Sequence, residues 1–525
     1  MPLKSLDKIG LHIFVVLFCF LSLILQLNHF ASDPGLGWHL KTGEYILENF
    51  KIPNKDLFLF SNIQNEWIVD QWFSDVLYWF LYSLGGWSLL YVFLIVYFLT
   101  SFTYVLYKYL IKFSNSYLLS ALVTLFAFKC SEVHFICRPV LLGFLFFLIT
   151  YFELYKYSVA EKNINFRKQA ILIFMIYVLW VNTHPSFVLG FVLFVFAFCD
   201  KFIQYLQGKN KLYFAQLKSI TLLGIMAFAA TIFNPFHIKL HYSVIWLSQS
   251  KFAMQAYQEW QAPPLAGTFG FLLFLPIAIV SLYLIINLLK KQNKEKINFY
   301  LISSFIFFLY YGITIVRFFP YYGIIASLTL VLYLKSILQI FRIEKCQKNK
   351  LIRLLVDSFS NLEKREKNSS GGSFVLVFIL VVLIIYQVPF GRVLFFKGDF
   401  GPTKDYYPYE AMEYLLSKNK QIRLLNSQNF GGFITLYGQD RVKAYIDDRT
   451  SLLKDEYYFN IEKKLTPSNI WQFAKELKAD YILLEYDPMY QELINFFKKN
   501  YFELVRVVDD RSLLLELPKN NEEFN

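Results

Sequence analysis

Residues 9–27, IGLHIFVVLFCFLSLILQL, run directly into NHFASDPGLGWHL at positions 28–40. The first stretch is long and apolar enough to cross a hydrocarbon core roughly 30 Å thick as a helix. Lys4 and Lys8 precede it, as they would precede a signal peptide, but the run is long for one and a poor cleavage site follows it. We therefore expect a retained first helix, with the carboxylate of Asp33 six residues past its end.

The composition of the whole chain is typical of a membrane protein. Of its 525 residues 56% are hydrophobic, including 58 Phe and 37 Tyr, which is more apolar surface than a soluble protein of this size requires. The net charge of +13 would suit a nucleic-acid partner, but the basic residues lie between apolar runs, where they determine topology. The five cysteines show no paired spacing and predict neither a disulfide framework nor a zinc site.

Apolar runs recur along the chain at the length expected of membrane-spanning helices. Three of them, 117–128, 170–181 and 220–233, are short for a full crossing, so they would extend through polar flanks or stop at a cavity. The sequence predicts about eleven such helices, at residues 9–27, 87–107, 117–128, 140–155, 170–181, 187–199, 220–233, 269–289, 297–316, 318–340 and 374–388.

The loops between these runs alternate in charge. One set is rich in Lys and Arg and ends in a basic cluster at 342–367, whereas the other set carries few basic residues before the C-terminal tail. Because positive loops stay in the cytoplasm, the N-terminus is predicted to lie inside. Asp33 and everything after Val388 then lie outside.

The tail differs from the rest of the chain. Apolar alternation predicts strands at 421–425, 442–446, 481–485 and 504–508, and amphipathic patterns predict helices at 410–418, 468–477 and 489–499. The polar segment NSSGGS at 368–373 is typical of a link before the last span. We expect a multi-spanning membrane domain at 1–390, with a first outer loop at 28–86, and a small α/β soluble domain at 391–525.

The first outer loop contains an amphipathic segment. From Leu36 to Lys51, apolar and charged residues fall on opposite sides of a helix, which predicts a helix lying along the membrane surface. Its expected apolar residues are Leu36, Leu40, Leu47 and Phe50. A second, aromatic-rich helix is expected at 72–84, where the chain returns to the membrane.

Asp33 allows two compatible interpretations. Asp followed by Pro34 is a good helix start, with Asp as N-cap and Pro at the first helical position. A cap residue can still present its second oxygen to a substrate, so a catalytic role stays open beside the structural one.

Several other polar residues map to the same outer side. Charged and polar groups near hydrocarbon are costly, so each is a candidate functional residue, with an interfacial or helix-capping role as the alternative. Arginines beside an aromatic-rich apolar body would suit a lipid-linked phosphate, which Arg binds bidentately. The candidates besides Asp33 are His39, Asp70, Arg138, His184, His237 and Arg317.

Two motifs in the tail favour ordinary turns. The pair Asp447-Asp448 before Arg449 could hold a metal, but such a pair is more often a turn. The glycines at 431 and 432 are not followed by the further glycines and Lys of a phosphate-binding loop. The sequence also contains no zinc pattern and no Gly-x-Ser-x-Gly elbow.

The order of these features resembles the bacterial C-type (GT-C) glycosyltransferase superfamily, near the group related to dolichyl-phosphate-mannose mannosyltransferases and lipopolysaccharide core galacturonosyl transferases. The resemblance covers most of the membrane part, while the tail matches only in place and size. It rests on Asp33, Trp38-His39-Leu40, Thr42-Gly43-Glu44, Pro53, Asp56, Gly85-Gly86, Asn182-Thr183-His184, Asn234-Pro235 and Arg317-Phe318-Phe319-Pro320.

This resemblance implies a polytopic helical enzyme that transfers a sugar from a polyprenyl-phosphate donor on the outer face of the membrane, with Asp33 as general base. The acceptor would be a glycan, lipid or protein, the membrane the bacterial inner membrane, and nucleic acid no partner. Metal-dependent members carry a second acidic residue where this chain has Gly35, which puts a divalent metal in doubt. No other cofactor is expected.

Two readings without glycosyl transfer stay open. A transporter of lipid-linked sugars would show inverted repeats and polar residues near the bilayer midplane, and no repeat is evident. A non-catalytic assembly protein would keep the fold and use the tail for docking. A closed, lipid-sized groove lined by Asp33 and an arginine would favour the enzyme, and a filled site the assembly protein.

Overall fold

The computed structural model describes residues 10–61, 63–289, 296–343, 353–354, 356–369 and 400–517. The last expected span, at 374–388, lies outside the described residues. Each of the other expected spans coincides with helix. Six helical segments of the described part are long and apolar enough to cross a membrane, and two shorter apolar helices accompany them. The chain is a polytopic helical membrane protein with a small α/β domain at its C-terminal end.

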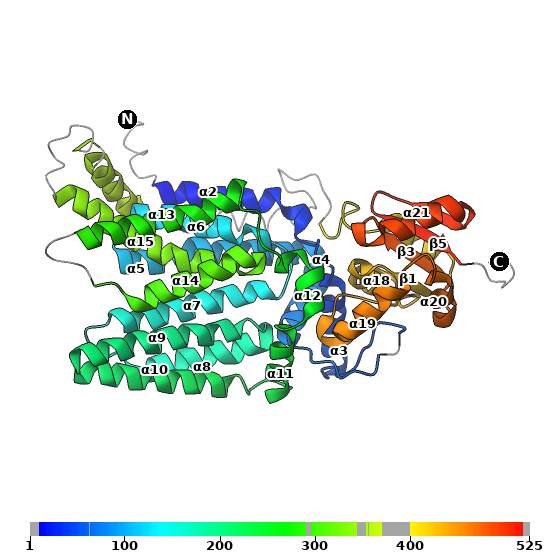
Figure 1. The fold of residues 1–525 in the computed structure, drawn as a ribbon, viewed down its shortest axis with the longest axis horizontal. Coiled ribbons are helices and arrows are strands. Elements are labelled where there is room, and N and C mark those ends of the chain that lie inside the picture. Colours follow the sequence, from blue (N-terminus) through cyan, green and yellow to red (C-terminus); the bar gives the residue numbers. More distant parts are fainter. Residues whose placement is uncertain are drawn as a thin grey trace.

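The helices of the membrane part run along the long axis of the molecule (Figure 1). Their bounds are α2 (Leu11–Leu25), α4 (Trp72–Phe98), α5 (Tyr107–Ser114), α6 (Tyr117–Ser131), α7 (Val140–Val159), α8 (Phe166–Thr183), α9 (Phe187–Gly208), α10 (Lys211–Ala230), α13 (Gly267–Leu289), α14 (Phe299–Thr314) and α15 (Phe319–Ile343), and a π-helical stretch, Leu99–Leu106, joins α4 to α5. Two short helices, α11 (Ile238–Leu247) and α12 (Lys251–Ala256), lie at the end of the bundle that faces the C-terminal domain.

Polar flanks lengthen the three spans that looked short in the sequence. Helices α6, α8 and α10 begin next to residues whose side chains cap the helix: Ser116, Asn165 and Asn210 accept hydrogen bonds from the backbone N–H of Leu119, Lys168 and Leu212. Such caps satisfy orphan donors at a helix start. The chain is therefore helical through its polar edges, and the helices reach 15, 18 and 20 residues.

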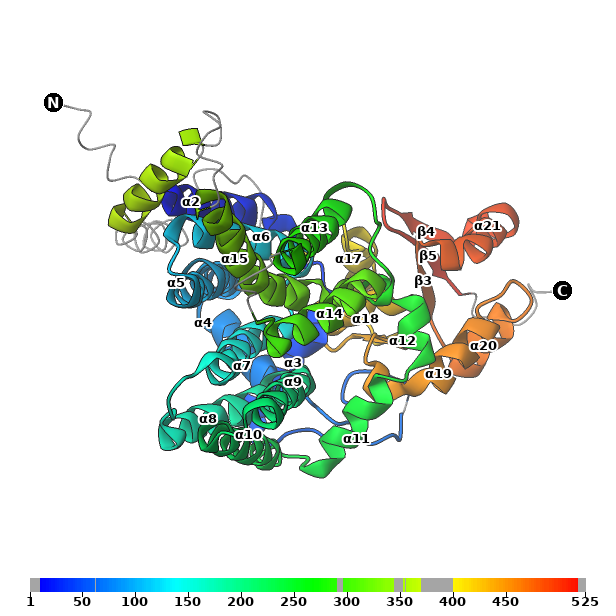
Figure 2. The ribbon, with the colours of Figure 1, turned by 60° about the vertical axis from the view of Figure 1, so that its left-hand side comes forward.

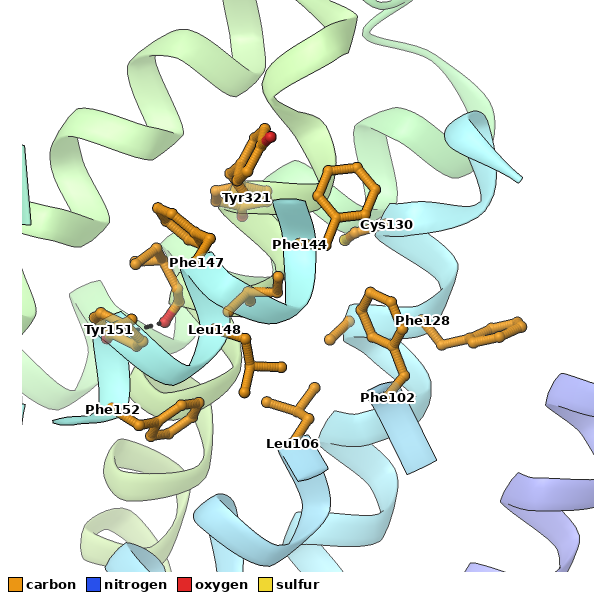
Figure 3. Packing of buried hydrophobic residues seen from close by; sticks show 14 of the residues in the cluster. Phe102, Leu106, Phe128, Cys130, Phe144, Phe147, Leu148, Tyr151, Phe152 and Tyr321 are labelled. Carbon is orange, nitrogen blue, oxygen red and sulfur yellow. Dashed lines mark hydrogen bonds between the residues drawn. The ribbon is translucent and has the colours of Figure 1, made fainter. Parts of the chain in front are cut away.

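Aromatic side chains fill the interior of the bundle (Figure 3). Tyr321 of α15 packs edge-on against Phe144 and Phe147 of α7, with ring centroids 5.1 Å and 4.9 Å apart. Edge-to-face pairs of this kind add directional packing to the burial of apolar surface. The starts of α7 and α15, which lie close behind Arg138 and Arg317 of the site described below, are thereby fixed relative to each other.

The C-terminal domain is built on a mixed five-stranded sheet with strand order β2-β1-β3-β5-β4. Strand β1 pairs in parallel with β2 and β3, and β5 is antiparallel to β3 and β4. The strands are β1 (Ile422–Asn426), β2 (Val442–Ala444), β3 (Tyr481–Glu485), β4 (Val505–Val508) and β5 (Ser512–Glu516), and the helices are α17 (Tyr409–Ser417), α18 (Gly431–Tyr437), α19 (Thr450–Lys464), α20 (Ile470–Leu477) and α21 (Gln491–Asn500). In two views this domain lies at one end of the bundle, beside α12 (Figures 1 and 2).

Helix α3 (Leu36–Asn49) forms in the first loop as expected, but its environment differs from the sequence interpretation. Leu36 and Leu40 are buried, whereas Phe50, placed on the apolar side by the sequence, is 92% exposed. The helix packs between α4 and α18 of the C-terminal domain. The buried side of α3 contacts protein on two flanks. The prediction that Phe50 belongs to the apolar side of this helix is therefore wrong.

The aromatic return helix and the second span are one helical segment. Helix α4 starts at Trp72, as expected, and continues to Phe98, with a break at Gly85 and Gly86. Gly86 has φ of +59°, a left-handed conformation that residues with a side chain seldom adopt. The two glycines therefore redirect the chain where the loop helix enters the bundle.

Two glycines bring the C-terminal domain into contact with the first loop. A Cβ on Gly37 of α3 would lie 1.8 Å from the carbonyl oxygen of Gly432 in α18, and a Cβ on Gly432 would lie 2.0 Å from the carbonyl oxygen of Pro34. Only residues without a side chain permit this approach. The two parts of the chain are thus docked at backbone distance.

We expect Gly432→Ala to lower the stability of this docking by roughly 1–3 kcal/mol, because overpacking a tight contact forces backbone shifts. Thermal unfolding and protease sensitivity of the detergent-solubilised protein would measure the effect. The matched control is Gly224→Ala in α10, where the nearest atom to the new Cβ is 3.6 Å away. Equal melting temperatures for both variants and the wild type would show that the glycine contact is not needed.

Candidate active site

An open cavity of about 850 Å³, its mouth included, lies between the end of the helix bundle and the C-terminal domain. Its walls come from segments far apart in the sequence: the start of α3, the loop before α7, the turn between α8 and α9, the loop after α12, the turn before α15 and the turn before α19. The charged and titratable side chains that line it are Asp33, His39, Asp70, Asp75, Arg138, His184, Tyr257, Glu259, Arg317, Asp448 and Arg449.

Asp33 is almost completely buried at the base of α3 and is paired with Arg138. The Nε of Arg138 donates to Asp33 Oδ1 at 2.8 Å, and Oδ2 accepts no hydrogen bond from the described residues. The backbone carbonyl of Asp33 accepts from Leu36 N–H and from Tyr407 Oη. The capping interpretation is wrong, since the residue that caps α3 is Gly35 and no side chain takes part. The Asp33 carboxylate faces Arg138 in the cavity.

Glu259 links the two arginines. Arg138 donates from Nη1 to Glu259 Oε2, and Arg317 donates from Nη1 to Oε1 at 2.9 Å. Burial favours the protonated form of Glu259, but the two guanidinium groups outweigh it and lower the pKa to about 2. The three side chains therefore carry a net charge of +1 at neutral pH.

Arg317 also stacks on an aromatic ring. Its guanidinium lies 5.4 Å from the ring centroid of Trp260, a cation–π arrangement. Arg138 is held by two carboxylates. Although burial favours its neutral form, Asp33 and Glu259 raise the pKa of Arg138 above its usual value. Of the two arginines, Arg317 is thus the one with fewer carboxylate partners.

His39 and Asp75 form a buried pair on another wall. Nδ1 of His39 lies 2.6 Å from Oδ1 of Asp75. Burial lowers the pKa of His39 to about 4, so the ring is neutral and only one of its two nitrogens carries a proton. Asp70 lies nearby, and burial raises its pKa to about 6 against the opposing hydrogen bond from Gln71. At pH 7 a carboxyl with a pKa of about 6 is mostly ionised, so this wall presents a neutral imidazole beside the charged carboxylate of Asp70.

His184 and His237 have different positions. His184 lines the cavity, accepts the backbone N–H of Ser186 at Nδ1, and has its pKa held well below the usual value by burial and by the charges of Arg317 and Arg138. It is therefore a neutral polar group of the site. His237 is exposed, lies 3.1 Å from the carbonyl of Ile232 and does not line the cavity. The structure thus leaves His237 out of the site.

Asp448 enters the cavity from the C-terminal domain. Trp38 Nε1 donates to Asp448 Oδ1 at 2.7 Å, across 410 residues of sequence. Burial raises the pKa of Asp448 to about 7, and the negative charge of Asp33 adds to the shift. Two carboxylates from opposite parts of the fold therefore share one site.

The neighbouring residues of the same turn hold it in place. Arg449 is buried, donates to Asp447 Oδ2 and to Asp56 Oδ1, and lies 4.5 Å from the ring centroid of Trp67. Asp447 is therefore engaged with Arg449, and the two adjacent carboxylates do not converge. In the described part of the chain, no group of three or more His, Cys, Asp and Glu side chains is arranged to hold a metal ion.

No protein-family model and no curated protein matches the sequence. Among solved structures, the chain is similar to the Archaeoglobus fulgidus oligosaccharyltransferase in its apo form, with 13% identity, coverage of 90% of this chain and 69% of that chain, and a TM-score of 0.54. The same enzyme tethered to an acceptor peptide containing the NVT sequon gives 11% identity, the same coverage and a TM-score of 0.52. ArnT from Cupriavidus metallidurans bound to undecaprenyl phosphate gives 10% identity, coverage of 96% and 97%, and a TM-score of 0.45.

The chain has a GT-C-like fold, similar to that of this oligosaccharyltransferase. Within this C-type fold, six of the seven candidate residues from the sequence line one cavity, and His237 is the exception. Sequence reasoning did not assign Glu259 or Asp448 to the site. Glu259 lies in the loop after α12, and Asp448 lies in the turn before α19. In the sequence, each is a carboxylate next to an aromatic or basic residue. That pattern is too common to identify either residue as part of the site.

Proposed function

We propose that this protein is a membrane glycosyltransferase that moves a sugar from a polyprenyl-phosphate donor to an acceptor hydroxyl on the outer face of the cytoplasmic membrane. The observation that carries the proposal is one open cavity in which Asp33, Arg138, Glu259 and Arg317 meet. The fold supports it, and the cavity is not filled by side chains, as it would be in a purely structural assembly protein.

The arginines supply the donor site. With Asp33 included, the formal charges of the two arginines and the two carboxylates sum to zero, so the site would recognise phosphate through guanidinium hydrogen bonds rather than through a net positive charge. Arg317 would contact the phosphate, because Arg138 is already paired with Asp33. As the bond between the sugar and the phosphate breaks, negative charge grows on the phosphate and the guanidinium stabilises it.

Asp33 serves the acceptor. Its Oδ1 is held by Arg138, so Oδ2 would accept the hydrogen bond of the acceptor hydroxyl and orient it, or remove its proton, as the new glycosidic bond forms. His39, Asp70 and His184 would line the space taken by the sugar and hydrogen-bond its hydroxyl groups. The polyprenyl chain would stay in the bilayer.

The proposed orientation rests on charge. Lysine-rich loops alternate with loops poor in basic residues along the chain, and basic loops remain in the cytoplasm. Asp33, Arg138, His184 and Arg317 belong to the other set of loops. Cysteine accessibility to a membrane-impermeant reagent, with single Cys substitutions in the loop at 161–165 and in the loop at 261–266, would test this orientation.

The proposal is tested by mass analysis of cell-envelope glycans from a deletion strain and by transfer assays with the purified protein in lipid nanodiscs. We expect one glycan to lose one sugar in the deletion strain, and the purified protein to release polyprenyl phosphate from the matching donor. Unchanged glycans in the deletion strain, together with no turnover of any polyprenyl-phosphate sugar, would contradict the proposal.

We expect Arg317→Lys to weaken use of the donor by roughly 10-fold or more while the protein folds normally. A lysine keeps the positive charge but cannot form the planar, bidentate contact with phosphate or the stack on Trp260. The measurement is KM for the donor alongside kcat. Lys239→Arg, at an exposed pair with Glu66, is the control. Unchanged kinetics in Arg317→Lys would show that Arg317 does not bind the donor phosphate.

A further inference from the structure

The turn Asp447-Asp448-Arg449 places a carboxylate of the C-terminal domain inside the cavity of the membrane part. Asp448 Oδ1 accepts the indole N–H of Trp38, and Oδ2 accepts no hydrogen bond from the described residues. Oδ2 lies 3.1 Å from the point where a Cβ on Gly35 would stand, so a side chain at position 35 would crowd this oxygen. The backbone of Asp448 is also fixed, since its carbonyl accepts a hydrogen bond from Tyr257 Oη.

The two carboxylates of the cavity have different surroundings. Asp33 is paired with a guanidinium at 2.8 Å, so one of its two oxygens already binds a cation. Asp448 has an indole N–H as its hydrogen-bond donor and no cation in contact in the described part of the chain. Of the two, Asp448 is therefore better placed to accept a proton.

We propose that Asp448 is a second catalytic carboxylate, which takes the proton of the acceptor hydroxyl while Asp33 orients that hydroxyl. This role rests on the proposed glycosyl transfer and divides between two residues the work that the sequence assigned to Asp33 alone. The C-terminal domain then completes the active site.

The step balances in atoms and charge. The acceptor oxygen forms a bond to the anomeric carbon, and its proton moves to Oδ2 of Asp448. The bond between the anomeric carbon and the phosphate oxygen breaks, and polyprenyl phosphate leaves with the electron pair. Asp448 returns its proton to water at the cavity mouth before the next turnover.

The electrostatic surroundings of Asp448 suit this role. A general base works best when its pKa lies near the working pH, and burial together with the charge of Asp33 raises the pKa of Asp448 to about 7. The titratable or charged groups around it are Asp33, Arg138, Asp447 and the phenols of Tyr257, Tyr407 and Tyr458. Removing the charge of Asp33 should therefore lower the pKa of Asp448.

Activity should depend on pH through the protonation state of Asp448. The base must be deprotonated, so kcat/KM should fall about tenfold per unit as pH drops below about 7 in the wild type, because the pKa of Asp448 is raised to about 7. We expect Asp448→Asn, which keeps the shape and the Trp38 hydrogen bond, to lower kcat by about 10²–10⁴-fold with little change in KM for the donor. Its residual activity should lose the inflection near pH 7.

A second readout does not need turnover. Infrared difference spectra of the full-length protein, titrated with acid, should show the carbonyl band of a protonated carboxyl that is missing from Asp448→Asn. In Asp33→Asn the band should appear only at lower pH. Asp440→Asn is the control for both measurements, because Asp440 is exposed in the same domain and already has the left-handed backbone that Asn tolerates.

The outcomes separate the two proposals. Wild-type protein inactive with every donor would overturn the proposed function and, with it, the catalytic role of Asp448. Wild-type activity, with Asp448→Asn retaining the wild-type kcat and pH profile, would overturn the role of Asp448 alone. An infrared band that persists in Asp448→Asn, or that does not move in Asp33→Asn, would show that the two carboxylates are not coupled.

Discussion

Asp33→Asn is expected to lower sugar transfer by about 10²–10⁴-fold, the range in which positioned carboxylates contribute to proton transfer. The substitution keeps the size and shape of the side chain and removes its negative charge. Arg138 then keeps Glu259 as its only carboxylate partner among the described residues. The measurement is turnover of a polyprenyl-phosphate sugar in nanodiscs, with the amount of folded protein checked by size-exclusion chromatography.

The fold should survive this change. The contacts that hold residue 33 in place use its backbone, through Leu36 N–H and Tyr407 Oη, and these remain in the variant. Asp440→Asn serves as the matched control and should behave as the wild type. If Asp33→Asn transfers sugar at the wild-type rate and is equally well folded, Asp33 has no role in the chemistry.

Arg449→Met is expected to destabilise the protein by about 3–5 kcal/mol, because removing one partner of a buried ion pair leaves uncompensated charge. Asp447, Asp56 and Arg449 are all at most a few per cent exposed at their side chains. The variant also loses the cation–π contact with Trp67. Unfolding of the full-length protein, followed by tryptophan fluorescence in detergent, would report the change.

Arg506→Met is the matched control on the same domain. Arg506 donates to Glu516 at 2.7 Å, a distance like those around Arg449, but both side chains are about a third exposed. Exposed pairs contribute roughly 0–1 kcal/mol, so this variant should melt near the wild type. Equal losses in the two variants would show that burial does not determine the importance of Arg449.

The membrane helices could be predicted because their signal is local. Length and apolar composition decide whether a run becomes a helix in a bilayer, and polar caps such as Ser116 and Asn165 extend it. The grouping of Asp33, Arg138 and Arg317 also followed from the sequence, since alternate loops share one side of a membrane. What the sequence could not supply was the pairing, in which Glu259 bridges the two arginines.

The tail was predicted less completely, for tertiary reasons. Strands β1, β3 and β4 were placed within one residue, whereas β5, α18 and α19 were not expected. Helix α18 begins with two glycines, which disfavour helix unless packing compensates, and here the contact with α3 does so. Helix α19 contains a non-helical residue at Lys454, which breaks its periodicity. The role of Asp448 depends on the docking of the whole domain, which no local pattern encodes.

Helix α3 belongs to two hydrophobic cores at once, since Leu36 and Leu40 pack in the core of the bundle and Trp38 packs in the core of the C-terminal domain. The site therefore joins residues that lie 410 positions apart in the chain. Bringing these residues together closes a loop of some 400 residues, which has an entropic cost. The contact can therefore form only late in folding. Nascent chains should thus be inserted into the membrane before their active site is complete. Truncation after the last membrane helix should leave a helix bundle without a complete site.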